Sequence, residues 1–243
     1  MTALSTPEHV TPHGRTLKVV RLQFINTQTF IWVPLMVLGG AWLVTLLVYL
    51  ILAGAGVDGP KYGGGSQAPM WYFAVVGAYA MTLTFPFSQA MSLTRREFFL
   101  GSMIAAAVSA LGLSAVFVAI GLFEQATGGY GINGYFAYLD WVWEAGALGA
   151  GFTFFVLTML FFTVGFWFAT IYKRFGPAML TAAILASVLL LVGIAALITW
   201  QQAWPEVGAW IVESGAVGLS LWGLLLGAVL AAGSYATLRR MPA

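Results

Sequence analysis

Few side chains in this 243-residue sequence are of types that perform acid–base or covalent chemistry. The chain has no cysteine and only two histidines, His9 and His13, which both precede the first long apolar run. None of the three lysines follows a glycine, so there is no phosphate-binding P-loop. General acid–base catalysis needs a positioned histidine, carboxylate or lysine, and the apolar runs contain none. We therefore expect no catalytic residue, no metal site and no cofactor bound by this chain.

Two further patterns have chemical readings that we set aside. The segment 129–134 matches GxGxxG, but no strand precedes it and no βαβ unit surrounds it, which indicates a flexible turn. Acidic residues near the loops between the apolar runs could act on an external substrate. Solvated charge is the simpler interpretation of those residues, which are Asp58, Glu124, Asp140, Glu144, Glu206 and Glu213.

Composition defines the class of protein that must hold these residues. Hydrophobic residues make up 60% of the chain and charged residues 7%, whereas soluble domains carry about 25% charged residues. This excludes a soluble enzyme, a disordered chain and a nucleic-acid binder. Runs of about 20 apolar residues each predict a membrane-spanning helix. The fold expected is an all-α integral membrane protein, in one domain, with six transmembrane helices at about 30–52, 70–89, 98–123, 145–171, 177–200 and 215–238.

The basic residues predict how these helices are oriented. Nine of the ten lysines and arginines fall on one side of the predicted spans, and Lys61 alone falls on the other. The positive-inside rule then predicts that both termini are cytoplasmic. No charged residue lies inside a predicted span, whereas ion-driven carriers usually bury ionisable groups at membrane depth. An energy source outside the chain is therefore favoured.

Two cytoplasmic segments have recognisable local patterns. Thr94 and Glu97 have the spacing of a capping box, which begins a helix, within a short turn that also offers a docking surface for a partner. The segment 15–29 has apolar residues at helical spacing with basic residues to one side, which favours an amphipathic interfacial helix after a flexible tail, 1–14. A basic juxtamembrane linker is the alternative for 15–29.

Neutral polar residues form a possible path within the spans. Tyr79, Thr82, Pro86 and Gln89 are spaced to share one face of the second span, where Pro86 can kink the helix. Hydrogen bonding between helices is the alternative role for this stripe. In the sixth span, glycines at 223 and 227 followed by Ala231 predict close helix packing.

Taken together, these features resemble the permease subunit of a type-2 ATP-binding-cassette (ABC) transporter. The resemblance covers the chain from about residue 15 to its end. It lies in the six spans, the basic interfacial segment, the TRREFFLG turn and the closing YATLRR segment. It implies a homodimer or a pair with a paralogous permease, bound to separate cytoplasmic ATPase subunits that hold ATP and magnesium. The loop before the sixth span often folds into re-entrant helices in this family, and 204–210 could do so.

The resemblance also implies roles for particular residues. Contact with the ATPase would involve Ser92, Thr94, Arg95, Arg96 and Glu97 in the turn, with Arg15, Lys18 and Arg21 from the interfacial helix. A path near the dimer axis would be lined by Tyr79, Thr82, Pro86 and Gln89 of span two and by Thr181 and Ser187 of span five.

The expected activity is export of a hydrophobic or amphipathic substrate, such as a drug, lipid or peptide, across a bacterial inner membrane. An ATP-independent channel or carrier and a non-transporting assembly subunit are the main alternatives, and an intramembrane enzyme is a weaker one.

Overall fold

The computed structural model describes residues 19–21, 23 and 27–240. It contains six helical segments long and apolar enough to cross a membrane, as expected of a multi-pass membrane protein. Five begin and end close to the predicted spans, whereas the sixth begins earlier, at Trp204. The segments are Gln28–Gly54, Gly64–Ala90, Arg95–Thr127, Gly146–Phe175, Pro177–Trp200 and Trp204–Arg239.

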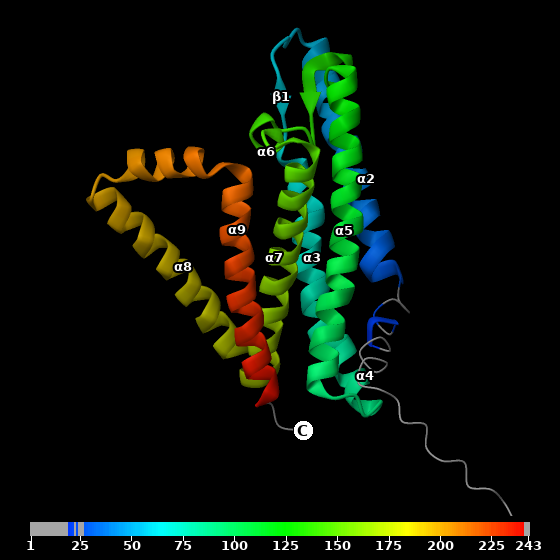
Figure 1. The fold of residues 1–243 in the computed structure, drawn as a ribbon, viewed down its shortest axis with the longest axis vertical. Helices are drawn as coiled ribbons and strands as arrows, with labels where there is room; N and C mark the ends of the chain where they lie inside the picture. Colours follow the sequence, from blue (N-terminus) through cyan, green and yellow to red (C-terminus); the bar gives the residue numbers. More distant parts are fainter. Residues whose placement is uncertain (1–18, 22, 24–26, 241–243) are drawn as a thin grey trace, which may run out of the picture.

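Figure 1 shows the order of the elements along the chain. They are η1 (Gln28–Trp32), α2 (Val33–Gly54), β1 (Lys61–Tyr62), η2 (Gly64–Gln67), α3 (Ala68–Tyr79), η3 (Ala80–Thr84), α4 (Phe85–Ala90), α5 (Arg95–Thr127), η4 (Gly129–Asn133), β2 (Gly134–Tyr135), α6 (Asp140–Trp143), α7 (Gly146–Phe175), α8 (Pro177–Trp200) and α9 (Trp204–Arg239).

The predicted interfacial helix is described only in part. Residues 19–21 and 23 are helical, and Arg21 is exposed. Val19 and Gln23 are buried, and the Gln23 amide donates a hydrogen bond to the Ser102 hydroxyl of α5 at 2.8 Å. The tail 1–14 and the predicted docking residues Arg15 and Lys18 lie outside the described residues.

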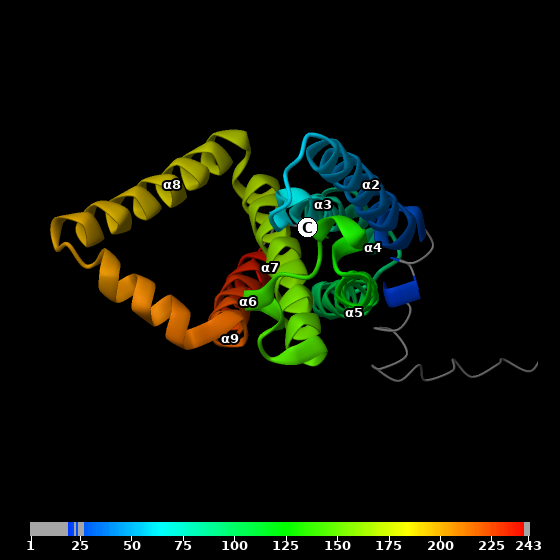
Figure 2. The ribbon, with the colours of Figure 1, turned by 90° about the horizontal axis from the view of Figure 1, so that it is seen from above.

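α7 is the central helix, and it packs against α3, α5 and α9 (Figure 2). Its aromatic residues supply much of the core, because Phe154, Phe162 and Phe166 are buried. Hydrophobicity does not drive helices together in lipid, so close backbone packing must contribute more. Such packing occurs between α3 and α7, where Gly77 faces the Phe162 carbonyl and Gly165 faces the Ala74 carbonyl with no room for a Cβ.

The second span is interrupted, as Pro86 predicts. The span begins with the 3-10 turn η2, continues through α3 and then widens into the π turn η3 immediately before Phe85 and Pro86. The amide of Phe85 reaches back to the Ala80 carbonyl, and the proline ring cannot donate the next bond of a regular helix. A π turn inserts one residue, so regular α-helical spacing does not hold across residues 80–84.

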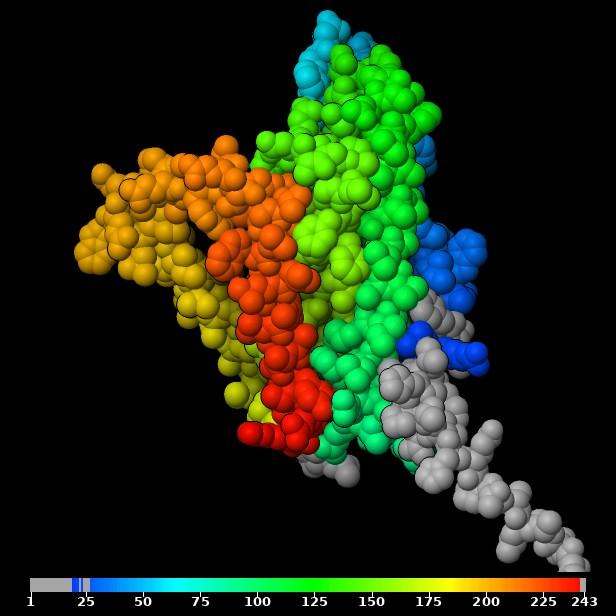
Figure 3. Space-filling model, viewed as in Figure 1, coloured from blue at the N-terminus to red at the C-terminus, as the bar shows by residue number. Residues whose placement is uncertain are grey.

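α8 and the first part of α9 stand apart from the bundle (Figures 1 and 3). No residue of α8 is buried, and among the described elements its main packing partner is α7. α9 is broken at Gly215, whose φ of 60° lies in the left-handed region that glycine tolerates. Residues 204–214 form a helix that runs crosswise, and 216–239 return along α7 (Figure 1).

One small sheet interrupts the predicted all-α fold. β1 and β2 pair in parallel, with Lys61 opposite Gly134 and Tyr62 opposite Tyr135. This pair joins the loop after α2 to the loop after α5 at one end of the bundle. We call the residues 55–63 and 124–145 at this end the outer cap.

Candidate functional site

The turn between α4 and α5 has the predicted capping box. The Glu97 amide donates to the Thr94 hydroxyl at 3.2 Å, and the Thr94 amide donates to the Glu97 carboxylate at 2.9 Å. Ser92 adopts a φ of 58°, which reverses the chain after α4. Both residues of the box are therefore engaged in starting α5, and Ser92 and Thr94 are exposed.

Two arginines near this turn are tied to the end of α9. Arg95 donates to the Arg239 carbonyl at 2.9 Å, and Arg174 donates to the Thr237 carbonyl at 3.2 Å. The last carbonyls of a helix have no partner within it and carry partial negative charge, which guanidinium groups satisfy. These bonds bring the ends of α5, α7 and α9 together, so their basic residues share one end of the bundle, as predicted.

The two neighbouring arginines of the turn consequently differ in exposure and in hydrogen bonding. Arg95 is partly buried and engaged with α9. Arg96 is exposed, and its guanidinium has no hydrogen-bond partner among the described residues. The family resemblance implied the same docking role for both residues. The geometry leaves Ser92, Thr94 and Arg96 as the exposed polar groups of this surface, which we call the capped turn.

The structure does not gather the predicted path residues within one chain. Tyr79, Pro86 and Gln89 are exposed, and Thr82 donates to the Ala78 carbonyl of its own helix. The predicted single-face stripe assumes regular helical spacing, which the π turn at 80–84 interrupts. In α8, Thr181 and Ser187 also donate to carbonyls of their own helix, and α8 stands away from α3 (Figure 2).

The outer cap contains a buried carboxylate that the sequence interpretation missed. Glu124 is fully buried at the end of α5, so the expectation of solvated charge is wrong for this residue, although the other five acidic residues of that set are exposed. Its carboxylate accepts bonds from the amides of the loop after α5 and from one phenol. The donors are the amides of Phe136 (3.0 Å), Ala137 (2.9 Å) and Tyr138 (2.7 Å) and the Tyr130 hydroxyl (2.6 Å).

Other bonds hold the same loop from different elements. Lys61 is buried, and its ammonium donates to the Ile132 carbonyl at 2.8 Å. The Tyr49 hydroxyl of α2 donates to the Tyr135 carbonyl at 2.9 Å. The Trp42 indole of α2 also donates to the Tyr130 hydroxyl at 2.7 Å, so the segment predicted as a flexible turn, 129–134, is tied to α2, β1 and α5. No short sequence pattern marks Glu124, because its donors are backbone amides that any residue supplies.

The hydrogen bonds of the outer cap hold its loops in place and leave little capacity to bind a ligand or a metal. Glu124 has four donors around its two oxygens, so no lone pair is directed at an external ligand. Among the described residues, no group of three or more histidine, cysteine, aspartate or glutamate side chains could hold a metal. The hydrogen bond to Asp140 raises the pKa of Tyr62, which identifies a second, exposed phenol–carboxylate pair.

Tyr130 gives the outer cap a measurable pH dependence. Burial and the hydrogen bond to Glu124 raise the pKa of Tyr130. A phenol whose folded-state pKa exceeds the unfolded value of about 10 stabilises the fold fully below that pH and progressively less above it. We expect Tyr130→Phe to cost roughly 1–3 kcal/mol near pH 8. The difference from wild type should shrink between about pH 9 and pH 12.

Thermal unfolding of the purified protein across this pH range measures the effect. Tyr172→Phe is the matched control, because Tyr172 is exposed and makes no hydrogen bond with its hydroxyl among the described residues. A Tyr130→Phe deficit that stays constant up to pH 12 would contradict the assignment.

In comparisons with models of known protein families, with curated proteins and with solved structures, the chain has no match.

Proposed function

We propose that this chain is the permease subunit of an ABC exporter, in which ATP and magnesium are bound by a separate cytoplasmic ATPase. The observation that carries the proposal is the capped turn. It is a short, rigidly capped polar segment at the end of the bundle where the basic residues gather. A rigid protrusion fixed to several helix ends can transmit the motion of a docked partner to the spans it joins.

The distribution of charge also supports an external energy source. In the six span segments, the charged residues occur near the helix ends or on the crosswise part of α9. Coupling to protons or sodium usually needs ionisable groups at membrane depth. Hydrolysis on a partner removes that need, and a charge-free interior suits a hydrophobic or amphipathic cargo.

The isolation of α8 supports a second permease copy. α8 buries no residue in the single chain, and the predicted path residues of α3, η3, α4 and α8 are separated. A homodimer, or a pair with a paralogous permease, would bring Tyr79 and Gln89 of one copy near Thr181 and Ser187 of another. The proposed setting is a bacterial inner membrane with both termini, and hence the capped turn, in the cytoplasm.

Charge reversal at Arg96 tests the docking role. We expect Arg96→Glu to reduce the ATPase retained on purified permease by about tenfold, because an exposed charge at an interface sets electrostatic complementarity. The fold should be unaffected, since Arg96 has no partner among the described residues. The measurement is the ratio of the two subunits after gentle purification from cells that express the chain with its genomic neighbours.

Lys173→Glu is the matched control, because it makes the same charge change at an exposed residue of the same end of the bundle. Wild-type retention in Arg96→Glu would contradict docking at the capped turn. Equal losses in both variants would also contradict it, because they would indicate a general effect of net charge. Transport by the chain alone, in vesicles without an ATPase, would favour the channel or carrier.

A further inference from the structure

An apolar hollow lies between the first and third spans, where two neighbouring helices fail to close on each other. α2 packs mainly against α3 and η2. α5 meets η1 near one end of α2, and η4, which follows α5, meets α2 near the other end. Between these two ends α2 and α5 make little direct contact. We call the space between them the α2–α5 groove.

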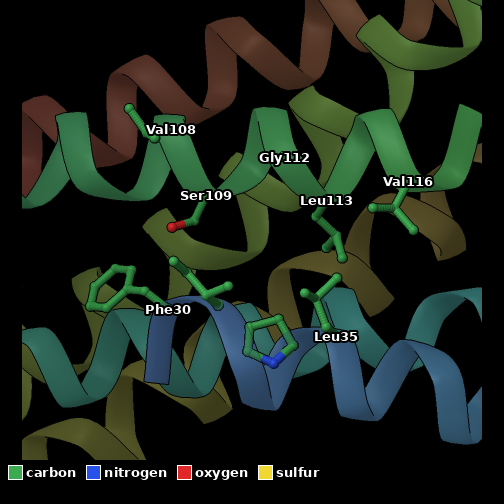
Figure 4. Close-up of a pocket in the computed structure, with 9 residues that line it drawn as sticks. Phe30, Leu35, Val108, Ser109, Gly112, Leu113 and Val116 are labelled. Carbon is green, nitrogen blue, oxygen red and sulfur yellow. The ribbon is translucent and has the colours of Figure 1, made fainter. Parts of the chain in front are cut away.

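Two hollows make up the groove, and they share Val116. The first has a volume of about 210 Å³ and includes Leu35, Ser109 and Gly112 in its walls (Figure 4). The second, about 530 Å³ and more open, continues to Trp42 and Tyr130. From residue 108 to residue 123 of α5 the groove follows about 22 Å of helix, at 1.5 Å per residue. An extended hydrocarbon chain fits such a path.

Ser109 supplies the polar side chain of the first hollow, which we call the inner hollow. Most serine and threonine hydroxyls in these helices donate to a carbonyl three or four residues earlier, as Ser114 and Thr158 do. The Ser109 Oγ is buried and has no hydrogen-bond partner among the described residues. Figure 4 shows its oxygen directed from α5 toward the gap beside α2. Buried hydroxyls are usually satisfied, so an unpartnered one facing a cavity points to a ligand atom.

The position of Ser109 far from the membrane surface restricts the chemical class of that ligand. It lies near the middle of the 33-residue helix α5, about 20 Å along the axis from Arg95. Phospholipids keep their charged headgroups and ester groups near the membrane surface, out of reach of this hydroxyl. A ligand that hydrogen-bonds at this depth must bring a neutral oxygen or nitrogen into the hydrocarbon region, because a charge there is costly.

We propose that the α2–α5 groove binds a neutral amphiphile from the bilayer. Its hydrocarbon chain would lie along the groove, and a hydroxyl or carbonyl group would hydrogen-bond to Ser109. The proposed binding requires neither ATP nor a second subunit. It goes beyond the proposed transport function, and its test does not depend on that function.

Photolabelling of the full chain in lipid nanodiscs, without nucleotide, tests the proposal. The probe is a long-chain alcohol carrying a diazirine on its chain, and labelled peptides are mapped by mass spectrometry. A phosphatidylcholine with the same diazirine chain reports ordinary lipid contact. We expect the alcohol to label α2 and α5 preferentially and unlabelled alcohol to compete, with weaker labelling of the groove by phosphatidylcholine.

Two substitutions make the test specific. Gly112→Leu fills the inner hollow without touching the backbone, because a Cβ at Gly112 meets nothing within 4 Å, and should reduce groove labelling by about tenfold or more. Ser109→Ala removes the hydroxyl and should reduce labelling by about three- to tenfold, the value of one hydrogen bond. Gly193→Leu is the control, since Gly193 of α8 also faces open space.

Each of three other outcomes would contradict the proposal. Equal labelling of the groove by alcohol and phosphatidylcholine would identify ordinary lipid contact. Unchanged labelling in Gly112→Leu would show that the probe lies elsewhere. Unchanged labelling in Ser109→Ala would exclude the hydrogen bond on which the ligand chemistry depends.

Discussion

Glu124→Gln is expected to destabilise the protein by about 2–5 kcal/mol, because each hydrogen bond to a charged group contributes about 1.5–3 kcal/mol. The wild-type carboxylate accepts four hydrogen bonds from donors that are themselves shielded from solvent. Glutamine keeps one oxygen and replaces the other with an NH₂ group, which would face either the Phe136 amide or the amides of Ala137 and Tyr138, donor to donor. In either orientation at least one backbone amide would lose its acceptor within a buried site.

Thermal unfolding in mild detergent measures this loss, for which we expect a fall in the midpoint of roughly 10 °C. Asp140→Asn is the matched control, because Asp140 is an exposed carboxylate of the same cap with one hydrogen bond, to Tyr62. The control should change the midpoint little, since exposed pairs contribute about 0–1 kcal/mol. Similar midpoints for the two variants would contradict a structural role for the Glu124 carboxylate.

Gly165→Ala is expected to disrupt the contact between α3 and α7. The added Cβ would overlap the Ala74 carbonyl, which is backbone and cannot rotate away as a side chain can. Relief requires the two helices to separate, and overpacking of this kind costs about 1–3 kcal/mol, occasionally more. Because α7 also packs against α5 and α9, a displaced α7 would loosen the rest of the bundle.

Gly227→Ala provides the comparison, because Gly227 lies on α9 and faces the central helix α7. A Cβ at Gly227 would meet only the Leu160 side chain, at 3.9 Å, which is an ordinary contact. Alanine is the better helix former by about 1 kcal/mol, so this variant should be neutral or slightly more stable. The measurement is the detergent-resistant folded fraction after heating. Equal losses in both variants would contradict the close α3–α7 contact.

The contrast between these glycines shows what helical spacing can predict. The stripe at 223, 227 and 231 predicted close packing, and Gly223 and Gly227 do face α7, but at ordinary contact distance. The tightest backbone approach instead involves Gly77 and Gly165, which the sequence interpretation did not single out. Spacing within one helix identifies a face that allows close approach, whereas which helix uses that face depends on the packing of all six.

The spans themselves were predictable because their signal is local. Length and hydropathy predicted all six, and Pro86 predicted the interruption of the second. The isolation of α8 was not predictable, since its composition resembles that of the buried spans. In lipid an apolar residue is equally compatible with a helix neighbour and with hydrocarbon, so composition does not distinguish them.

In the candidate site, too, interactions between residues close in sequence were predictable, whereas those between distant residues were not. The capping box of Thr94 and Glu97 was predicted from four consecutive residues and is confirmed, because both partners are local. The bond from Arg95 to Arg239 joins residues 144 positions apart, and only the fold brings them together. The Glu124 interactions depend on backbone amides of a loop whose path the sequence does not indicate.

Identification of what purifies with the chain tests the central claim most directly. The chain would be isolated in mild detergent from cells that express it with its native genomic neighbours, and its companions identified and quantified. We predict a nucleotide-binding subunit in fixed ratio to this chain, reduced about tenfold by Arg96→Glu and retained in Lys173→Glu. A homogeneous preparation without any nucleotide-binding subunit would contradict the account and leave the capped turn as a helix start and a topological anchor.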